Sequence, residues 1–481
     1  MKIPQLVQRI LKELEEDHKA YVVGGCVRDL LLSKDPKDWD IATDAKPEAI
    51  EKLFENSFIN NDFGTVTVVN EVENPALREV EITPFRTEEQ YSDKRHPDQV
   101  EWTSSLKEDL SRRDFTINAM AMDLTENITD PFGGQDDLQK QLIRTVGKPE
   151  KRFAEDALRM MRAVRFYTTL GFKIGRKTKT AIKLNKNSLQ TISNERIRDE
   201  LMKIINNERA SYGVEKLREL GLLQFIIPEL EENFGVPQNK HHVYNCYEHA
   251  VRSLQYAAQQ DYSEEVRLAA LLHDIGKPES KEGQGEDATF YNHEVISADL
   301  TEEILKRLRF PKDKIEKVTK LVRHHLFYYT PEEVSESSVR RLIRKVGLED
   351  MDELIQVRKA DRIGSGVPKA EPYKLRHLRY VIDKVSQDPI STKMLEVSGD
   401  DVMDLLGIDP GPKVGQVLAI LLGEVLEDPE KNNEEFLKEK LKELQELSDS
   451  KIEDLAQKAK QKRNEIKTKR DEMLKEKYWV Q

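Results

Sequence analysis

Apolar residues divide the chain into two parts that differ in periodicity. Over residues 1–146 short apolar runs such as Ala20–Val23 alternate with helical segments, whereas from residue 147 onward apolar residues recur at helical spacing. We therefore expect an α+β domain followed by all-α domains. The helices expected first in the second part cover 151–170, 176–184, 195–205 and 214–219.

The first apolar run ends in a turn that suits a phosphate group. Gly24 and Gly25 follow this run, and glycine lets a backbone turn tightly and approach a ligand closely. A helix is expected to begin at Leu30–Leu32, and a helix N-terminus behind a glycine turn offers free N–H groups to a triphosphate. Arg28 adds a permanently charged, forked phosphate donor. The pattern predicts a nucleotide-binding turn, with an ordinary surface turn as the alternative.

Three acidic residues form a candidate catalytic site. Asp38 and Asp40 flank a tryptophan, so on a strand both carboxylates face the same side. Glu81 lies in an expected strand over 79–83 and points away from the apolar side of that strand. Carboxylate oxygens favour Mg²⁺, and two such ions can activate a hydroxyl and steady a leaving pyrophosphate. We expect all three acids to be catalytic, with Mg²⁺ held by the two aspartates.

A second polar set lies on the helix expected over 151–170. Asp156, Arg159 and Arg162 are spaced three residues apart and share about a third of the helix circumference, and Arg165 lies further round. An aspartate accepts from the exocyclic amine of cytosine or adenine, while an arginine donates to ring and carbonyl acceptors. Such a pair can match C and A and reject G and U without a nucleic-acid template. The alternative is a charged helix surface.

In this order the motifs resemble those of class II tRNA nucleotidyltransferases, which comprise the bacterial CCA-adding enzymes and related poly(A) polymerases. The resemblance covers about the first 230 residues. It implies a polymerase-β-like nucleotidyltransferase head with a small mixed sheet over 1–146, and an all-α neck and body over 147–232. The segments that carry it are Gly24–Asp29 with Asp38–Asp40, the ribose-reading motif Arg112–Met120, the hinge motif Asp130–Gly134, the base-selecting segment Glu155–Phe166 and its brace Glu195–Leu201.

The resemblance implies template-independent addition of CCA to tRNA 3′ ends from CTP and ATP. An A-adding enzyme or a poly(A) polymerase shares these motifs and stays an alternative. The polar segment Tyr91–Asp98 resembles the flexible loop that the family uses to change from CTP to ATP. The residues expected to bind the nucleotide are Gly24, Gly25, Arg28, Arg113, Asp114, Asn118, Asp156, Arg159, Arg162 and Arg165.

Histidines and aspartates mark a second candidate site. The apolar helix expected over Leu268–Leu272 ends in the pair His273-Asp274, and Gly276 then stops the helix. Imidazole and carboxylate ligands suit a transition metal such as Ni²⁺, Mn²⁺, Fe²⁺ or Co²⁺. The order of these residues resembles the HD phosphohydrolase superfamily, which implies an all-α HD domain over 233–375 with metal-dependent phosphohydrolase activity. The ligands that this resemblance implies are His249, His273, Asp274, His293, His324 or His325, and Asp361.

Residues 376–481 are expected to form a helical tail region. One long helix is expected over 433–477, and its segment 451–477 holds ten Lys/Arg against six Asp/Glu, a net charge of +4. Interspersed charges are typical of a solvated helix, and the alternative is an arm that grips the tRNA backbone.

A protein of another class, an HD phosphohydrolase whose head only binds RNA, is disfavoured because Asp38, Asp40 and Glu81 are all present.

Composition gives expectations about the cellular location and the partners of the protein. The net charge is −12, and a negative net charge disfavours binding to RNA, although basic residues can still cluster on one face. Cys26 and Cys246 are far apart and in no Cys-x-x-Cys motif, which favours a reducing, cytoplasmic location. No apolar run approaches the length of a membrane span. We expect tRNA, CTP and ATP as partners and no membrane, and the sequence leaves the oligomeric state open.

Overall fold

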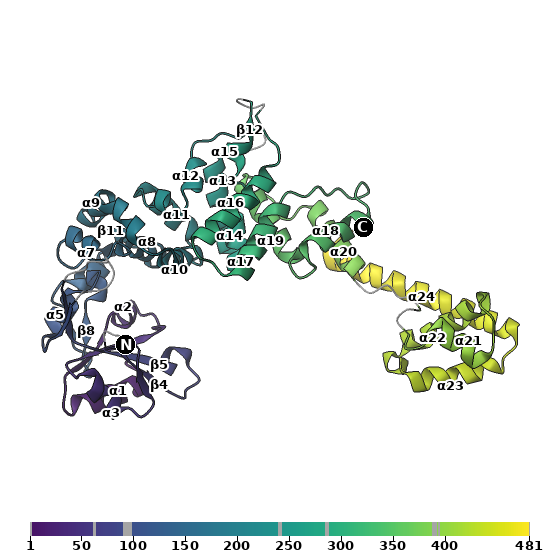
Figure 1. Cartoon of the computed structure of the whole chain (residues 1–481), viewed down its shortest axis with the longest axis horizontal. Helices are drawn as coiled ribbons and strands as arrows, with labels where there is room; N and C mark the ends of the chain where they lie inside the picture. The colour runs from purple at the N-terminus through teal and green to yellow at the C-terminus, as the bar shows by residue number, and fades with distance from the viewer. Residues whose placement is uncertain are drawn as a thin grey trace. The chain divides into compact units, whose positions relative to one another are not determined.

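The computed structural model describes residues 2–60, 64–89, 99–238, 243–283, 288–386, 392 and 395–480. The chain forms two compact units, Met1–Leu326 with Glu353–Ala370, and Phe327–Asp352 with Glu371–Gln481. The first unit contains a mixed sheet near the N-terminus followed by helices, and the described residues of the second unit are mainly helical (Figure 1). The expectation of an α+β head followed by helical parts is confirmed.

The head contains a mixed sheet of seven strands. The strands are β1 (Ala20–Val23), β2 (Trp39–Thr43), β3 (Ser57–Ile59), β4 (Val66–Val69), β5 (Glu79–Pro84), β8 (Ala121–Met122) and β9 (Ile128–Thr129). Their order is β3-β4-β5-β2-β1-β8-β9. Strands β2 and β5 run parallel and the other neighbouring pairs run antiparallel. This pairing places Asp40 of β2 beside Glu81 of β5.

Short helices contact this sheet. They are α1 (Gln5–Glu15), α2 (Gly25–Leu31) and α3 (Pro47–Leu53). Helix α2 begins directly after Gly24, whose φ of 82° turns the chain out of β1. The expectation of a helix that begins at Leu30–Leu32 is wrong, because Cys26 and Val27 already lie on the buried face of α2.

The segment between Glu81 and Arg112 is largely regular where it is described. A hairpin of β6 (Arg86–Glu89) and β7 (Gln99–Trp102) is followed by helix α5 (Leu106–Ser111). Ser105 caps α5 by accepting from the backbone N–H of Glu108. The segment Tyr91–Asp98, which we expected to be a flexible loop, lies outside the described residues.

The neck is helical as expected, with one break. Its main helices are α7 (Pro149–Glu155), α8 (Arg159–Leu170), α9 (Arg176–Asn185), α10 (Asn194–Ile205), α11 (Ala210–Glu219) and α12 (Pro228–Glu232). The single helix expected over 151–170 is wrong, because the chain is extended at Asp156, with φ −142° and ψ 108°. The Asp156 carboxylate accepts from the backbone N–H of Leu158 at 3.0 Å, a local bond that competes with a continuous helix.

A second group of helices follows the neck in the first unit. It consists of α13 (Cys246–Gln259), α14 (Glu264–Leu272), α15 (Lys277–Ser280), α16 (His293–Arg307), α17 (Lys312–His324) and α19 (Met351–Gly364). A capping box of Asn245 and Glu248 begins α13. Every residue of α14 from Val266 to Leu272 is buried, so the two residues that follow it enter the interior.

The second unit has its own apolar core. Its helices are α18 (Glu336–Val346), α20 (Tyr373–Ser386), α21 (Gly399–Leu406), α22 (Pro412–Glu427), α23 (Glu434–Gln445) and α24 (Asp449–Tyr478). The single helix expected over 433–477 is wrong, because the chain turns between Gln445 and Asp449. This turn lets Leu444 and Ile452 enter the same core. Within the described residues, every helix is too short or too polar to cross a membrane.

Candidate functional sites

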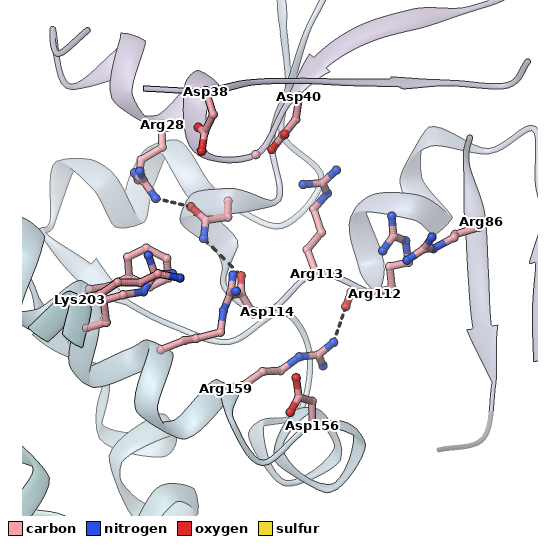
Figure 2. A pocket seen from close by; sticks show the side chains of 16 residues that line it. Arg28, Asp38, Asp40, Arg86, Arg112, Arg113, Asp114, Asp156, Arg159 and Lys203 are labelled. Atoms are coloured by element: carbon pink, nitrogen blue, oxygen red, sulfur yellow. Dashed lines mark hydrogen bonds and ion pairs between the residues drawn. The ribbon is translucent and has the colours of Figure 1, made fainter. Parts of the chain in front are cut away.

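A cavity of about 600 Å³ is lined by most of the residues that the sequence singled out in the head and neck. All ten of the expected nucleotide-binding residues line it, together with Asp38 and Asp40, whereas Glu81 does not. Figure 2 shows the two aspartates at one end of the cavity and Asp156 with Arg159 at the other. The lining residues that sequence reasoning did not single out are Arg86, Arg112, Phe166 and Lys203.

The glycine turn brings the backbone against the catalytic end of the cavity. A Cβ atom on Gly24 would lie 2.8 Å from Arg113 Nη1 and 3.3 Å from Asp40 Oδ2. The first contact is too close for a side chain and the second is tight, so a Cβ at this position would displace the end of the Arg113 side chain. Arg113 also lies 3.6 Å from the buried carboxylate of Asp109.

The acidic residues of the head repel one another. Burial raises the pKa of Asp40 to about 6, Arg113 opposes this shift, and Asp38 and Glu81 add to it. Burial also raises the pKa of Glu81, and Asp38 and Glu79 raise it further. Asp38, Asp40 and Glu81 do not bring three oxygens within 4.8 Å of one another. Asp38 and Asp40 both line the cavity, and their role as ligands of a divalent cation stays a prediction, as does the catalytic role of Glu81.

A chain of polar contacts joins the glycine turn to the neck. Arg28 Nη1 donates to Asn118 Oδ1 at 2.8 Å, and Asn118 Nδ2 donates to Asp114 Oδ1 at 3.3 Å. Arg162 Nε donates to Asp114 Oδ2 at 2.7 Å. Burial alone would raise the pKa of Asp114, but Arg162 and then Arg159 outweigh it and hold the pKa at about 2. Asp114 therefore stays ionised as an acceptor in the cavity wall.

The expected base-reading residues line the cavity although only the arginines lie on α8. Asp156 precedes the helix and accepts from Arg196 Nη2 at 2.8 Å. Arg159 Nη1 donates to Glu155 Oε2 at 2.7 Å, and its Nη2 donates to the backbone carbonyl of Arg112 at 3.1 Å. These contacts hold both side chains at the same end of the cavity (Figure 2).

The last arginine of this set contacts an aromatic ring and an acid. Arg165 Nε lies 2.9 Å from Glu200 Oε2, and its guanidinium lies 4.3 Å from the ring centroid of Phe166. Lys203 lies 3.2 Å from the same Glu200. Arg165 thus lines the cavity beside a second positive charge, where it can meet an anionic ligand.

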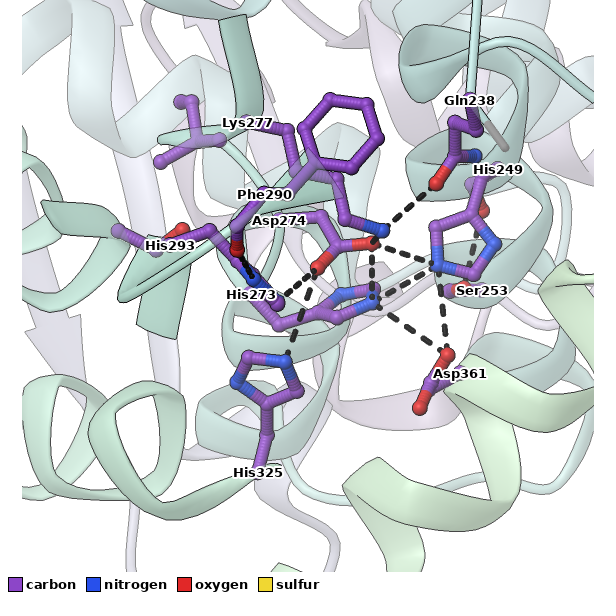
Figure 3. Close-up of polar contacts among 12 residues, drawn as sticks. Gln238, His249, Ser253, His273, Asp274, Lys277, Phe290, His293, His325 and Asp361 are labelled. Atoms are coloured by element: carbon purple, nitrogen blue, oxygen red, sulfur yellow. Dashed lines mark hydrogen bonds and ion pairs between the residues drawn. The ribbon is translucent and has the colours of Figure 1, made fainter. Parts of the chain in front are cut away.

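A separate cluster of histidines lies around Asp274, at the end of α14. Asp274 joins two groups of potential metal ligands, one with His249 and His273 and the other with His293 and His325. Asp274 Oδ2 lies 3.1 Å from His249 Nε2, and its Oδ1 lies 3.3 Å from His293 Nε2 and 3.6 Å from His325 Nε2. Figure 3 shows the side chains converging on this carboxylate.

Backbone carbonyls fix how three of these imidazoles are oriented. The Nδ1 atoms of His273, His293 and His325 lie 2.9, 2.7 and 2.6 Å from the carbonyls of Ala270, Phe290 and Val322. A carbonyl oxygen only accepts, so each Nδ1 carries the proton and donates it. The Nε2 atoms are left to face Asp274, which is the arrangement that a histidine metal ligand requires.

Of the remaining expected ligands, Asp361 lies at the cluster and His324 does not. Asp361 Oδ1 lies 3.4 Å from His249 Nε2 and 3.8 Å from His273 Nε2, so it belongs to this cluster. His324 belongs to neither ligand group, because it is the last residue of α17 and only partly buried, whereas His325 is buried. Of the two histidines that the sequence left open, the structure places His325 at the cluster.

The charges within the cluster keep its carboxylates ionised. Burial opposes a charged imidazole, but Asp274 and Asp361 raise the pKa of His273 to about 10. Burial likewise opposes a charged carboxylate, but His273 and then Lys277 lower the pKa of Asp274 well below its usual range. Lys277 Nζ lies 2.5 Å from Asp274 Oδ2 and 2.6 Å from Gln238 Oε1. A buried carboxylate kept ionised among imidazoles is a donor set that fits transition metals.

Three family models match the chain in the order in which these sites occur. The Poly A polymerase head domain matches residues 20–144, the probable RNA and SrmB-binding site of polymerase A matches 171–234, and the HD domain matches 246–365. The sheet, the cavity and the histidine cluster therefore define a protein with a nucleotidyltransferase-type head joined to an HD domain.

Similar proteins narrow this class to one family. The CCA-adding enzyme of Geobacillus sp. (strain WCH70) is 34% identical over 433 residues, which cover 89% of this chain and 94% of that protein. The chain belongs to the family of CCA-adding enzymes. The crystal structure of the Bacillus stearothermophilus CCA-adding enzyme in complex with CTP is 30% identical with a TM-score of 0.61, and the match covers 92% of this chain and 98% of that chain.

Some relatives match over a shorter segment at higher identity. The CCA-adding enzyme of Lactobacillus johnsonii is 53% identical over 197 residues, which cover 40% of this chain and 48% of that protein. The chain spans about half the length of this and several other curated relatives that it matches.

Proposed function

We propose that this protein adds CCA to the 3′ end of tRNA from CTP and ATP. The observation that carries the proposal is the single cavity that joins Asp38 and Asp40 to Asp156 and Arg159. One end of this cavity has the acids that nucleotidyl transfer requires, and the other end has the donors and acceptors that can distinguish bases. Membership of the family of CCA-adding enzymes supports the same function.

The catalytic end would act with Mg²⁺. Asp38 and Asp40 supply hard oxygen ligands. Burial, and to a lesser extent the charges of Asp38 and Glu81, raise the pKa of Asp40, and a bound cation would favour its ionised form. When bound, Mg²⁺ supplies positive charge for the attacking 3′-hydroxyl and the leaving pyrophosphate. Arg28 and Arg113 are placed to hold the triphosphate, because both line the cavity next to the aspartates.

The selective end acts through hydrogen bonds. Asp156 accepts from the amine of cytosine or adenine, and Arg159 donates to a ring acceptor. Glu155 and Arg196 hold these two side chains by ion pairs, so a base that fits competes with protein contacts already present. Asp114, ionised and hydrogen-bonded to Asn118, is placed to accept from a ribose hydroxyl.

An A-adding enzyme or a poly(A) polymerase is the alternative within this class. The same cavity would serve either activity, and the head model that matches carries the polymerase description. Transfer assays separate them, using tRNA that lacks CCA, tRNA that ends in CC, and complete tRNA, each with single nucleotides. CTP incorporation into the first substrate and ATP incorporation into the second are expected. Incorporation of ATP alone, with elongation of complete tRNA, would favour the alternative.

The HD domain supports a second function. Two ligand groups that share Asp274 suit a metal-dependent phosphohydrolase with Ni²⁺, Mn²⁺, Fe²⁺ or Co²⁺. When bound, the metal supplies a Lewis acid next to a phosphoester. We expect hydrolysis of 2′- or 2′,3′-cyclic phosphates, which would clear a damaged end before the head rebuilds it. Assays of the purified protein with each metal test this function, and its failure would leave the domain as a spacer.

The domain division and the setting of the protein belong to the same proposal. The head covers 1–146, the neck and body 147–232, the HD domain 233–375 and the tail region 376–481. Cys26 and Cys246 are buried free thiols, which suits a reducing cytoplasm. Limited proteolysis tests the boundaries, because cleavage is expected to concentrate between the proposed domains.

A further inference from the structure

A small cavity opens directly onto the HD cluster. Its volume is about 260 Å³, and it is lined by four of the proposed metal ligands together with Lys277, Arg358 and Arg362. Pockets that enclose a drug-sized ligand measure roughly 300–1,000 Å³. The cavity therefore has room for a phosphoryl group and part of the sugar that carries it, and the rest of a nucleotide would remain outside.

Two of the three cationic side chains are already paired with the cluster. Lys277 Nζ lies 2.5 Å from Asp274 Oδ2. Arg358 Nη1 donates to Asp361 Oδ2 at 2.5 Å, so the other oxygen of Asp361 faces the histidines. These two cations hold carboxylates in place, and their charge is largely balanced within the protein.

Arg362 differs from these two cations. Its Nε and Nη2 both donate to the backbone carbonyl of Lys369 at 3.4 Å, and within the described part of the chain it forms no ion pair with a carboxylate. It follows Arg358 by four residues on α19, so both guanidinium groups lie on one helix face. Arg362 therefore gives the cavity a guanidinium that a phosphate group can contact without displacing a carboxylate from an ion pair.

We propose that Arg362, with Arg358 beside it, binds the terminal phosphate of a phosphomonoester at the HD site. The proposal rests on the hydrolase function proposed above and narrows its substrate class, because it favours the 2′-phosphate, a monoester, over the 2′,3′-cyclic phosphate, a diester. In the reaction water attacks phosphorus, the ester P–O bond breaks, the alcohol leaves with a proton, and inorganic phosphate remains. A monoester has three non-bridging oxygens and up to two negative charges, whereas a diester has two such oxygens and one charge. A forked guanidinium therefore favours the monoester.

The test uses the full chain loaded with Mn²⁺ and inorganic phosphate as the probe. Arg362→Gln should weaken phosphate binding about tenfold or more in titration calorimetry, because a charge-assisted contact is lost. Arg362→Lys should recover part of the affinity. Lys359→Gln is the matched control, because Lys359 lies on the same helix but does not line the cavity. Metal content measured by mass spectrometry should be equal in all four proteins.

Kinetics with two model esters complete the test. The KM of Arg362→Gln should rise about tenfold for p-nitrophenyl phosphate and less than threefold for bis(p-nitrophenyl) phosphate, with kcat nearly constant. Unchanged phosphate affinity at full metal content overturns the inference, and so does an equal loss for both esters. If the wild type binds phosphate through Arg362 but hydrolyses neither ester, the hydrolase function fails while the phosphate site stands.

Discussion

Gly24 has a geometric requirement that its neighbour Gly25 lacks. Its φ is 82°, and a Cβ there would meet Arg113, whereas a Cβ on Gly25 would lie 3.7 Å from its nearest atom. Gly24→Ala should therefore destabilise the fold by about 1–3 kcal/mol and lower nucleotide transfer, because Arg113 must move. Gly25→Ala should lose less of both. Denaturant unfolding and CTP incorporation check the pair, and equal losses would contradict the assigned role of Gly24.

Asp40 should be essential for transfer. Asp40→Asn keeps the shape of the side chain but removes the charge that a Mg²⁺ ligand needs, so CTP incorporation should fall below detection while tRNA affinity changes little. Asp35→Asn is the control, because this exposed carboxylate lies outside the cavity. Glu81→Gln should lose less activity, because Glu81 does not line the cavity. Incorporation close to the wild-type rate by Asp40→Asn would refute the metal site.

Arg159 should contribute to base choice more than to binding. Arg159→Ala removes a donor worth roughly 1–3 kcal/mol of discrimination, so the preference for CTP over UTP in kcat/KM should fall about 5- to 150-fold. Glu155→Gln keeps the arginine and removes its charged partner, and it should retain more of the preference. A CTP/UTP ratio that is unchanged in Arg159→Ala would show that this side chain does not read the base.

The prediction at the scale of an element concerns the segment that joins β6 and β7. The residues that join these two strands, 90–98, lie outside the described residues, and both strands belong to the head. Shortening the joining segment should spare addition of the two C residues and stop addition of the final A. Gel analysis of products from CTP alone and from CTP with ATP checks this result. An equal loss of both additions would mean that the segment only supports the fold.

Elements with strong periodicity could be predicted, and their ends could not. The apolar run at Ala20–Val23 predicts β1 correctly. The alternation around Asp40 predicts β2, but this strand begins at Trp39, so Asp38 lies just before it.

Periodicity predicts a helix through Asp156, because it does not detect the hydrogen bond from Leu158 N–H to this carboxylate, which competes with helical geometry. In the tail, helical spacing continued through residues 446–448, although the apolar core requires a turn there.

The candidate site could be predicted where its residues are close together in the sequence. The nucleotide-binding set lies in three short motifs, and all of it lines one cavity. Arg112 and Phe166 lie inside two of these motifs, so the sequence would have predicted them if every polar and aromatic residue of each motif had been considered. Arg86 and Lys203 come from other elements, and only folding brings them to the cavity. No local signal marks such residues.

At the scale of the whole molecule, the head cavity and the HD cluster share no residue. The first has carboxylate donors next to arginines, and the second has histidines around a buried carboxylate. Oxygen ligands favour Mg²⁺, whereas imidazoles favour softer divalent ions. The two activities should therefore be separable both by substitution and by the choice of metal.

The double variant His273→Ala/Asp274→Ala should lose phosphoester hydrolysis and keep CCA addition, because its substitutions remove ligands from both histidine groups and none from the head. Asp40→Asn is the reciprocal control, since it should lose CCA addition and keep hydrolysis. After removal of metals, Mg²⁺ alone should restore the first activity, and Mn²⁺, Co²⁺ or Ni²⁺ the second. Circular dichroism must show that both variants are folded. If the folded double variant loses CCA addition, the two sites are coupled and the proposed independence is wrong.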